Sequence, residues 1–532
     1  MAFFDKGRLF RRLLIGLAAV LVVIIVVLLA VPLLVPSDFI AAQIASIVRQ
    51  KTGRDLRISG PISFSVMPRV VLVAHDVTLA NPSGFSGDFI SVKTVDVELK
   101  ALALLHGSIE IDQLRLLQPR ADFEVEKDGR RNWLFHLSKP VLSVMPTARG
   151  SVAPSFVTGN VTIVGGEASY LDRRDGPKRS VNDLNMTLSL PSLDEPLKAA
   201  GNAVYSGDRI DLAVTIVSPA ELRDDRPSAA MVHIVTSTHG SLGFLGEIAR
   251  SDVHHASGTI HVAIPSLRNL LAWAQIRSAK QEENLGPMTI DGRIDGDAAK
   301  LALADATIQL DQVTAKGTYV LTRTHQHQEL DLDNLALYGG TGAGKIVADE
   351  TGPTPTVSVT FDLTGITVHD VSLNIAGFDK LSGTGDVSVN LAASGSTEHD
   401  LIASLNGSSR INFTNGAIGS AGQAPLLKIG PVIGDQTTRG EIEYRSLTAS
   451  ATIVCGVLHN SDLKLVGPWL SATGGGTLDL GPRQIDYLWQ PDIAGIGSAR
   501  IAITGDWDNP QYKVQSITIT KDLALPRGLK LR

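Results

Sequence analysis

An apolar run near the N-terminus constrains this chain more than any other feature. The run covers residues 13–35, about 23 residues, and a helix needs about 20 to cross the hydrocarbon core of a bilayer. No basic residue follows the run until Arg49, whereas four precede it: Lys6, Arg8, Arg11 and Arg12. By the positive-inside rule, this asymmetry predicts a single-pass anchor with a cytoplasmic N-terminus and the rest of the chain across the membrane.

A cleaved signal peptide is the alternative for this segment. The apolar core of a signal peptide spans about 7–15 residues and ends at small residues of the A-x-A kind. The run here is longer and ends Ala30-Val31-Pro32-Leu33-Leu34. Both differences favour an uncleaved signal anchor.

The part of the chain after this run has the composition of a folded protein without a nucleic-acid surface. Of 532 residues, 44% are hydrophobic and 19% are charged, which is within the globular range. The net charge of −6 and the aromatic content of 5% provide neither a basic surface nor many rings for stacking on bases. Cys455 is the single cysteine, so no intramolecular disulfide can form, and its apolar neighbours predict a buried, inert thiol.

Beyond Gly53, short segments with a two-residue hydrophobic period predict β-strands that have one apolar and one polar face. In residues 94–100, for example, Val95, Val97 and Leu99 alternate with polar side chains. The pattern is weakest between residues 170 and 300. The same period marks these further segments: 62–66, 210–216, 357–363, 387–391, 463–465, 478–480, 501–503 and 517–519.

Local signals interrupt and connect these strands. The period shifts by one between Ile111 and Leu114, which predicts a β-bulge near Asp112-Gln113. Tight turns are predicted at three dipeptides: Asp128-Gly129, Asn406-Gly407 and Asn415-Gly416. Helical spacing predicts short helices over residues 37–50, 267–276 and 425–429, and the first of them is amphipathic.

These patterns predict a mainly β fold with antiparallel strands and a few short helices after one transmembrane helix. A sandwich, a closed barrel and an open curved sheet all fit, because each of them gives every strand one apolar face. A segment rich in Pro, Ser and Gly predicts a linker at residues 140–154. The expected parts are a cytoplasmic tail, the anchor, an N-terminal β unit, the linker, a central β body, a C-terminal β region and a tail, at residues 1–12, 13–35, 36–139, 140–154, 155–330, 331–520 and 521–532.

A glycine-rich run is the first of two candidate ligand sites. Residues Gly339–Lys345 match the first part of a phosphate-binding P-loop. However, Ile346 stands where the motif needs Ser or Thr to hold magnesium, and the next stretch is too short for the helix that should follow. A glycine-rich turn between strands is the better interpretation.

Histidines form the second candidate. His325 and His327 share a strand face if that segment is extended, and His254 and His255 are adjacent. Neither pair has an acidic residue or cysteine at metal-ligand spacing, which favours solvated surface positions. We therefore expect no metal, no nucleotide, no other cofactor and no enzymatic activity.

Several short motifs near both ends of the chain resemble the AsmA family. Each motif alone is only a turn with its flanking strands, but together they are specific. In the N-terminal part, residues 38–136, the resemblance rests on residues 51–68, 81–85, 104–111 and 128–133. In the C-terminal part, residues 330–515, it rests on residues 337–340, 381–386, 405–408, 415–417 and 505–510. Met67 departs from the family, which usually has an aromatic residue before the first proline.

The resemblance implies a protein that is anchored in the bacterial inner membrane, extends into the periplasm and is similar to bridge-like lipid-transfer proteins of the chorein type. It implies an elongated, strongly curved, groove-like β-sheet that assists phospholipid transport between the two membranes and outer-membrane biogenesis. The expected partners are phospholipids, the inner membrane and, at the C-terminal end, outer-membrane or envelope proteins. The side chains expected to line the groove are Ile62, Phe64, Val66, Val95, Val97, Leu99, Ile109 and Ile111.

Three other functions stay open on the sequence alone. The chain can be a structural or regulatory factor that affects outer-membrane protein assembly or protein localisation to the membrane. It can also be a hydrolase with an unrecognised site, or a receptor-like binding module. Phospholipid bound to the purified protein would favour transport, whereas closed sheets without lipid would favour the structural factor.

Overall fold

Two compact β units make up the part of the chain that the computed structural model describes. The described residues are 37–65, 69–100, 111–134, 158–174, 176, 178–250, 254–274, 285–324, 326–419 and 441–519. The boundary between unit 1 (Met1–Arg250) and unit 2 (Ser251–Arg532) falls after β11. The predicted anchor at residues 13–35 and the predicted linker at residues 140–154 lie outside the described residues. Among the residues described, no helix combines the length and the apolar character needed to span a membrane.

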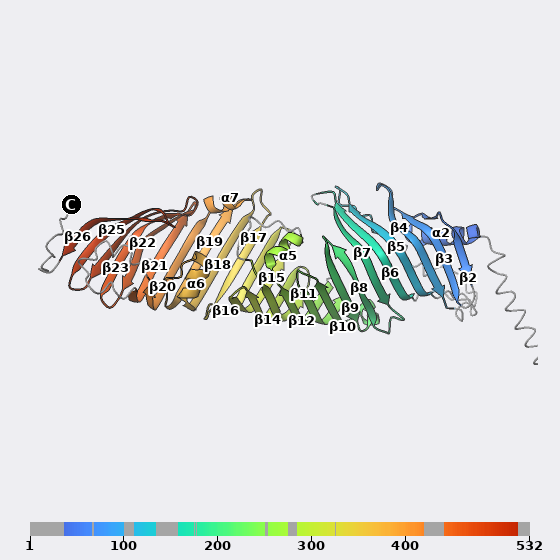
Figure 1. Ribbon diagram of the computed structural model, residues 1–532, viewed down its shortest axis with the longest axis horizontal. Coiled ribbons are helices and arrows are strands. Elements are labelled where there is room, and N and C mark those ends of the chain that lie inside the picture. The colour runs from blue at the N-terminus through green and yellow to red at the C-terminus, as the bar shows by residue number, and fades with distance from the viewer. Residues whose placement is uncertain are drawn as a thin grey trace, which may run out of the picture. The chain divides into compact units, whose positions relative to one another are not determined.

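Unit 1 is a sheet whose strands follow one another in chain order (Figure 1). Both β1 and β2 pair with β3, and from β3 to β11 each strand pairs with the next. The strands are β1 (Leu56–Ile58), β2 (Ile62–Ser65), β3 (Val70–Ala80), β4 (Asp88–Leu99), β5 (Ile111–Val125), β6 (Thr158–Asp172), β7 (Arg179–Ser189), β8 (Leu197–Tyr205), β9 (Asp208–Ile216), β10 (Ser228–Thr236) and β11 (Ser241–Arg250).

One pair in unit 1 departs from the predicted antiparallel arrangement. Strands β5 and β6 are parallel, with Leu116 opposite Ile163, whereas the pairs on either side, β4 with β5 and β6 with β7, are antiparallel. Parallel neighbours need a crossover connection rather than a hairpin. The 126–157 segment between β5 and β6 is long enough for such a crossover.

Unit 2 is a sheet in which every strand from β12 to β26 is antiparallel to the next. The strands are β12 (His254–Ile264), β13 (Met288–Gly296), β14 (Lys300–Leu310), β15 (Val313–Arg323), β16 (His327–Leu337), β17 (Gly340–Asp349), β18 (Thr356–Thr367), β19 (Thr384–Ser394), β20 (Asn406–Ile418), β21 (Ile442–Val454), β22 (Val457–Val466), β23 (Leu470–Asp479), β24 (Gln484–Ile493), β25 (Gly497–Asp506) and β26 (Gln511–Ile519).

The predicted strands and the predicted bulge are confirmed where the structure describes them. Residues 94–99 lie in β4, and their half-buried apolar side chains share one face. Between β4 and β5, Glu98 is opposite Gln113 but Leu99 is opposite Ile111. Asp112 is therefore the extra residue, and the bulge lies where the shift in hydrophobic period predicted it.

Five short helices connect or precede strands in the described residues. They are α2 (Ser37–Thr52), α4 (Pro219–Arg223), α5 (Leu267–Trp273), α6 (Val368–Ala376) and α7 (Glu398–Ala403). The predicted amphipathic helix is α2, which half-buries Ile44 and Val48 and ends at Gly53 with a left-handed φ of 71°. Helix α5 begins at the predicted residue, whereas the helix predicted at residues 425–429 lies outside the described part of the chain.

Three local predictions are wrong. Asn406-Gly407 and Asn415-Gly416 are not turns between strands; both dipeptides lie inside β20. Gly407 faces Leu391 of β19 and Ile453 of β21, so strand pairing on both sides outweighs the local turn preference. Cys455 is exposed rather than buried, because it occupies the tight turn between β21 and β22 with a φ of 49°. Asp128-Gly129 is a turn, as predicted.

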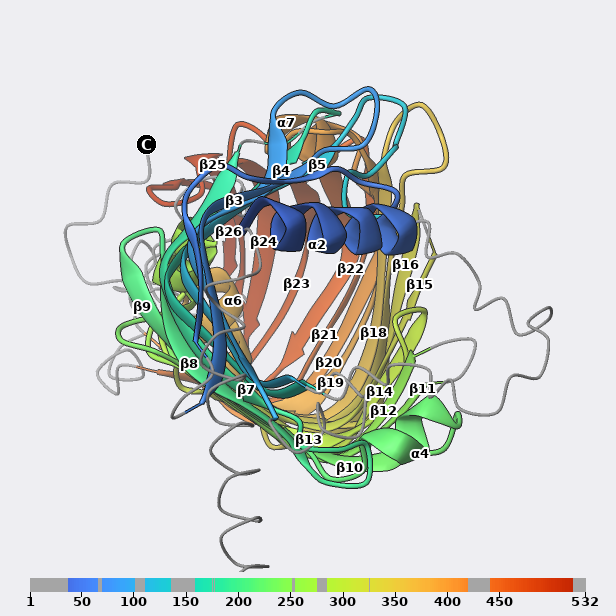
Figure 2. The same cartoon turned by 90° about the vertical axis from the view of Figure 1, so that its right-hand side faces the viewer.

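Each sheet is curved rather than flat, as the bending of the strands in Figure 2 shows. Left-handed residues recur inside the strands, and in unit 1 they include Asp76 in β3, Gln118 in β5, Gly165 in β6 and Asp183 in β7. Gly165 and Asp183 lie at shifts in register, as β-bulges do. A bulge bends its strand and increases the local twist, so bulges at matching positions curve the whole sheet.

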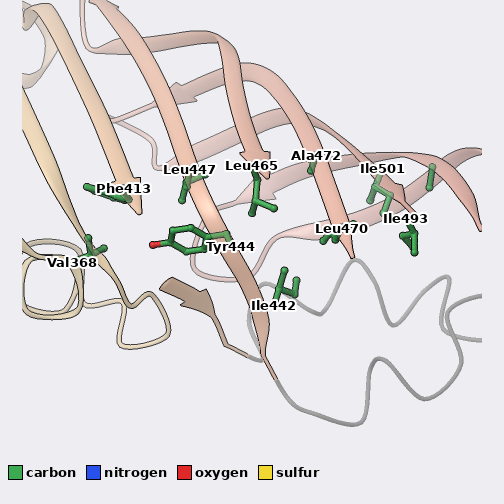
Figure 3. Packing of buried hydrophobic residues seen from close by; sticks show 11 residues of the cluster. Val368, Phe413, Ile442, Tyr444, Leu447, Leu465, Leu470, Ala472, Ile493 and Ile501 are labelled. Carbon is green, nitrogen blue, oxygen red and sulfur yellow. The ribbon is translucent and has the colours of Figure 1, made fainter. Parts of the chain in front are cut away.

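The most completely buried side chains of unit 2 form two clusters, and Figure 3 shows the larger of them. It includes Leu465, Leu470 and Ile501, whose exposed fractions are 2% or less. Val368, the first residue of α6, belongs to the same cluster. The smaller cluster includes Leu335 and Ile366. These two clusters give the sheet a packed core.

Candidate functional site: an apolar face on each sheet

The structure brings the predicted groove residues together in rows that run across the strands of unit 1. Ile62 lies opposite Ala74, which in turn faces Val95. Phe64 begins the next row, which contains Val97, and Leu99 lies opposite Ile111. Val66 and Ile109 are outside the described residues. Directly paired residues point to the same side of a sheet, so the six described residues share one face.

Both rows continue far beyond the predicted residues. From β2 to β11, the first row is Ile62, Ala74, Val95, Leu116, Ile163, Met186, Gly201, Leu212, Ile234 and Leu242. The second is Phe64, Leu72, Val97, Leu114, Val161, Leu188, Ala199, Val214, Val232 and Phe244. Neither row contains a charged or hydroxyl-bearing side chain. We call this surface the apolar face of unit 1.

Unit 2 has an apolar face of the same kind. From β12 to β25, one row of paired residues is Ala256, Gly296, Leu301, Leu321, Leu330, Ile346, Val359, Leu391, Gly407, Ile453, Leu458, Leu478, Ile485 and Gly505. Every member is aliphatic or glycine. The sequence predicted strands here but not that their apolar residues would fall into one register.

The apolar side chains in these rows are mostly half-exposed. In the two rows of unit 1, only Ala74 and Phe244 are buried, and in the row of unit 2 only Ile453 is. Side chains on the inner side of a bent single sheet are crowded by their neighbours, whereas those on the outer side are not. The alternation of half-buried apolar and exposed polar residues along β9 and β26 therefore indicates that the apolar face is the inner side of each curved sheet.

Charged residues gather on the opposite face, where they pair with one another across strands. Lys345 of β17 lies between two residues of the apolar face, so its own side chain points to the other side. Its Nζ lies 2.7 Å from Oε1 of Glu329 and 2.9 Å from Oδ1 of Asp331, both in β16. Hydrogen bonds to these two carboxylates raise the pKa of Lys345.

The glycine-rich run, residues 339–345, is mostly part of a strand. Residues from Gly340 onward form strand β17, and only Tyr338 and Gly339, with left-handed φ angles of 52° and 77°, form a turn. The predicted turn is therefore shorter than the glycine run. Lys345 is held by carboxylates in a strand, which is not the loop-and-helix geometry of a phosphate site.

Two of the candidate histidines lie beside carboxylates of the neighbouring strand. His327 Nδ1 is 3.4 Å from Oδ2 of Asp349, and His255 Nε2 is 3.8 Å from Oδ2 of Asp295. His325 is outside the described residues. Within the described ranges, His, Cys, Asp and Glu side chains form no group of three or more that could hold a metal ion.

Two polar clusters could not be predicted from the sequence, because their members are far apart in the chain. In unit 1, the buried carboxylate of Asp208 accepts hydrogen bonds from Ser237, Thr238 and His239, which lie in the turn after β10. In unit 2, Tyr487 donates from its hydroxyl to Oδ1 of Asn460 at 2.5 Å. Burial, followed by the charge of Asp462, raises the pKa of Tyr487 to about 12.

The fold and the site define a class of protein: a curved β-sheet that presents a continuous, uncharged, half-exposed aliphatic face across many strands. The sequence matches the model of the AsmA family over residues 9–322 and 324–463. Because the match covers most of the chain, the protein belongs to the AsmA family, and the resemblance of its motifs is confirmed. No curated protein and no solved structure matches it.

Proposed function

We propose that this protein assists phospholipid transport between the inner and outer membranes, and thereby outer-membrane biogenesis, by offering acyl chains an apolar β-groove. It acts without catalysis, from a single-pass inner-membrane anchor at residues 13–35 with a cytoplasmic N-terminus and a periplasmic body. Family membership supports an envelope role. The observation that carries the proposal is the uncharged row of unit 2, which runs without interruption from Ala256 in β12 to Gly505 in β25.

Exposing the acyl chains of a phospholipid to water costs free energy. Each CH₂ group moved from an apolar environment into water costs about 0.8 kcal/mol, so a phospholipid cannot cross an aqueous gap with both tails exposed. An aliphatic floor lowers this cost, because it shields part of each tail from water. The half-exposure of the row residues supports this role, because part of each side chain remains available to a ligand.

The absence of polar side chains from the rows favours lipid transport rather than tight binding of one ligand. A pocket that selects one ligand places a few polar groups to fix its orientation. The rows contain none, whereas charged groups such as Lys345 lie on the opposite face. A surface of this kind favours sliding of chemically uniform acyl chains, while the head group stays in solvent.

Native mass spectrometry of the full-length protein tests the proposal. We expect co-purified phospholipid on the wild-type chain. Replacing the paired row residues Val359 and Leu391 by Asp should abolish it. The matched control replaces Thr360 and Asn390 by Asp, because these two residues are also paired in β18 and β19 but face the other side.

The two variants separate the proposed function from the structural alternative. Loss of lipid from the Val359→Asp/Leu391→Asp chain but not from the control is the expected outcome. A wild-type chain that carries no phospholipid contradicts lipid transport. It would favour the structural or regulatory factor for outer-membrane protein assembly or localisation.

A further inference from the structure

Aromatic rings on the apolar face of unit 2 lie against glycines of the neighbouring strand. A methyl group on Gly344 in β17 would lie 2.5 Å from Cδ1 and Cε1 of Phe361 in β18. A methyl group on Gly474 in β23 would lie 2.7 Å from Cε1 of Tyr487 in β24. In both places the nearest atoms belong to the ring, and at Gly474 the side chain of Leu463 lies 3.2 Å away as well. The backbone of the neighbouring strand does not crowd either position.

Strand pairing places both rings over the floor of the face. Gly344 lies directly opposite Phe361. Gly474 lies opposite Trp489, so Tyr487 reaches it diagonally from its own partner Gly476. The hydrogen bond from Tyr487 to Asn460 fixes the ring in this position.

The same arrangement occurs twice more, with additional crowding by the backbone. A methyl group on Gly385 would meet Phe413, and one on Gly416 would meet Tyr444. At both of these glycines, backbone oxygens also lie too close for a side chain. Substitution there would disturb strand pairing, so the first two pairs are the ones that can be tested cleanly.

Glycine in a strand interior weakens the strand and often marks a place where another group approaches closely. An aromatic ring on the neighbouring strand can cover such a glycine and restore part of the packing that a side chain would provide. A ring that covers a glycine in this way also stays close to the backbone of the sheet. With alanine in place of glycine, the ring would have to rise from the sheet.

The height of the rings matters because of where they lie. Phe361 is two residues from Val359 along β18, so its ring borders the aliphatic row of unit 2. Tyr487 is likewise two residues from Ile485, which belongs to the same row. A raised ring at either position would stand beside the path of a ligand that follows this row.

We propose that the pairs Gly344–Phe361 and Gly474–Tyr487 set the clearance above the apolar face, so that an acyl chain can pass over two large aromatic residues. This inference rests on the proposed lipid-transport function. The two glycines and their aromatic partners would then limit the shape of ligand that can pass along the face.

Photo-crosslinking of lipid at a neighbouring position tests this clearance. A photoreactive residue replaces Leu391, the partner of Val359, in the purified full-length protein, which is then incubated with vesicles of phosphatidylethanolamine and phosphatidylglycerol. We expect Gly344→Ala to lower the lipid adduct by about fourfold, which corresponds to exposing one more CH₂ group to water, at about 0.8 kcal/mol. The double variant Gly344→Ala/Phe361→Leu should restore it, because no ring is left to be raised.

The matched control is Gly475→Ala. Gly475 is the neighbour of Gly474 but points to the opposite face, where a methyl group would come no closer than 3.2 Å to another atom. Its lipid adduct should equal that of the wild type. The parallel pair of variants, Gly474→Ala and Gly474→Ala/Tyr487→Leu, with the photoreactive residue at Leu458, repeats the test at an independent position.

The outcomes distinguish this inference from the function on which it rests. A wild-type chain that labels while Gly344→Ala and Gly474→Ala label equally well overturns the clearance role and leaves lipid transport intact. A wild-type chain without lipid adduct overturns both. If thermal melting shows that both single variants fail to fold, the pairs serve sheet stability alone, and the clearance role is overturned.

Discussion

The guanidinium of Arg54 donates a hydrogen bond from Nη2 to the backbone carbonyl of Asn132, 78 residues further along the chain, at 2.5 Å. Arg54 lies two residues after the end of α2 and packs over the ring of Phe89 at 4.8 Å. Asn132 is fully buried after the turn that follows β5. The hydrogen bond therefore links the segment between α2 and β1 to the segment that follows β5.

Asn132→Ala should destabilise unit 1 by about 2 kcal/mol, because it leaves part-buried backbone groups without hydrogen-bond partners. The Asn132 side chain accepts from the backbone N–H of Glu124 and donates to the carbonyl of Asp122 and to Asn81. Chemical denaturation of the full-length protein measures the loss. The exposed Asn390 serves as the control position, since Asn390→Ala should change the free energy of unfolding by less than about 0.5 kcal/mol.

Val97→Asp should block lipid labelling while the protein stays folded. Val97 is half-buried on the apolar face, so water can reach a carboxylate there, and we expect a loss of only about 1–2 kcal/mol. A charge in a sealed core would be far more costly and would unfold unit 1. Thermal melting and lipid photo-crosslinking of the same sample report the two effects separately.

The comparison for Val97→Asp is Thr94→Asp on the opposite face of β4. Thr94 Oγ1 lies 3.1 Å from Nδ1 of His75, so a carboxylate at this position gains an imidazole neighbour. Thr94→Asp should melt and label as the wild type does. Unfolding of the Val97→Asp chain, together with unlabelled wild type, would instead indicate a sealed scaffold.

Acid should weaken unit 1 through Asp208. Burial opposes ionisation of this carboxyl, but hydrogen bonds from Ser237, His239 and Thr238 outweigh it and lower its pKa to about 2. A depressed folded-state pKa gives stability that is present above the ordinary value near 4 and is lost as the pH falls toward 2. The loss should be on the order of 2 kcal/mol, and unfolding free energies between pH 6 and pH 2 measure it.

Asp208→Asn removes this pH-dependent contribution, so the variant should be less stable at pH 6 and should lose less on acidification. The exposed Asp492 provides the matched control position, because Asp492→Asn should change the unfolding free energy at pH 6 by less than about 0.5 kcal/mol. An Asp208→Asn chain with the same acid slope as the wild type would contradict the assignment.

Cys455 should react with a maleimide in the folded protein without any denaturant, because its side chain is exposed in a turn. Mass spectrometry after a short exposure measures the reaction, and a Cys455→Ala chain gives the background. Labelling that required denaturant would support the buried thiol that the sequence pattern predicted.

Much of the fold could be predicted because period-two alternation is a local property. Val95, Val97 and Leu99 share a face in the sequence and in β4 alike, and even the bulge at Asp112 is visible as a shift in the period. The cross-strand rows could not be predicted in this way. Register depends on bulges and pairings between distant segments, such as the parallel pairing of Leu116 with Ile163.

The wrong turn predictions share one physical cause. Asn406-Gly407 and Asn415-Gly416 have strong turn preferences, yet neighbouring strands on both sides hold them in β20. Similarly, the glycines of β17 look like a loop in the sequence but lie in a strand, where Gly344 accommodates the ring of Phe361. Tertiary pairing outweighs local propensity at these positions, and no signal within a short window of sequence reports it.

Residue-by-residue photo-crosslinking along β9 tests the central claim most directly. A photoreactive residue is placed in turn at Asp211, Leu212, Ala213 and Val214 of the full-length protein, and adducts are identified by mass spectrometry. The apolar face predicts phospholipid adducts at Leu212 and Val214 and none at Asp211 and Ala213, which alternate with them. Phospholipid at neither face, or equally at both, would contradict an apolar β-groove that carries lipid.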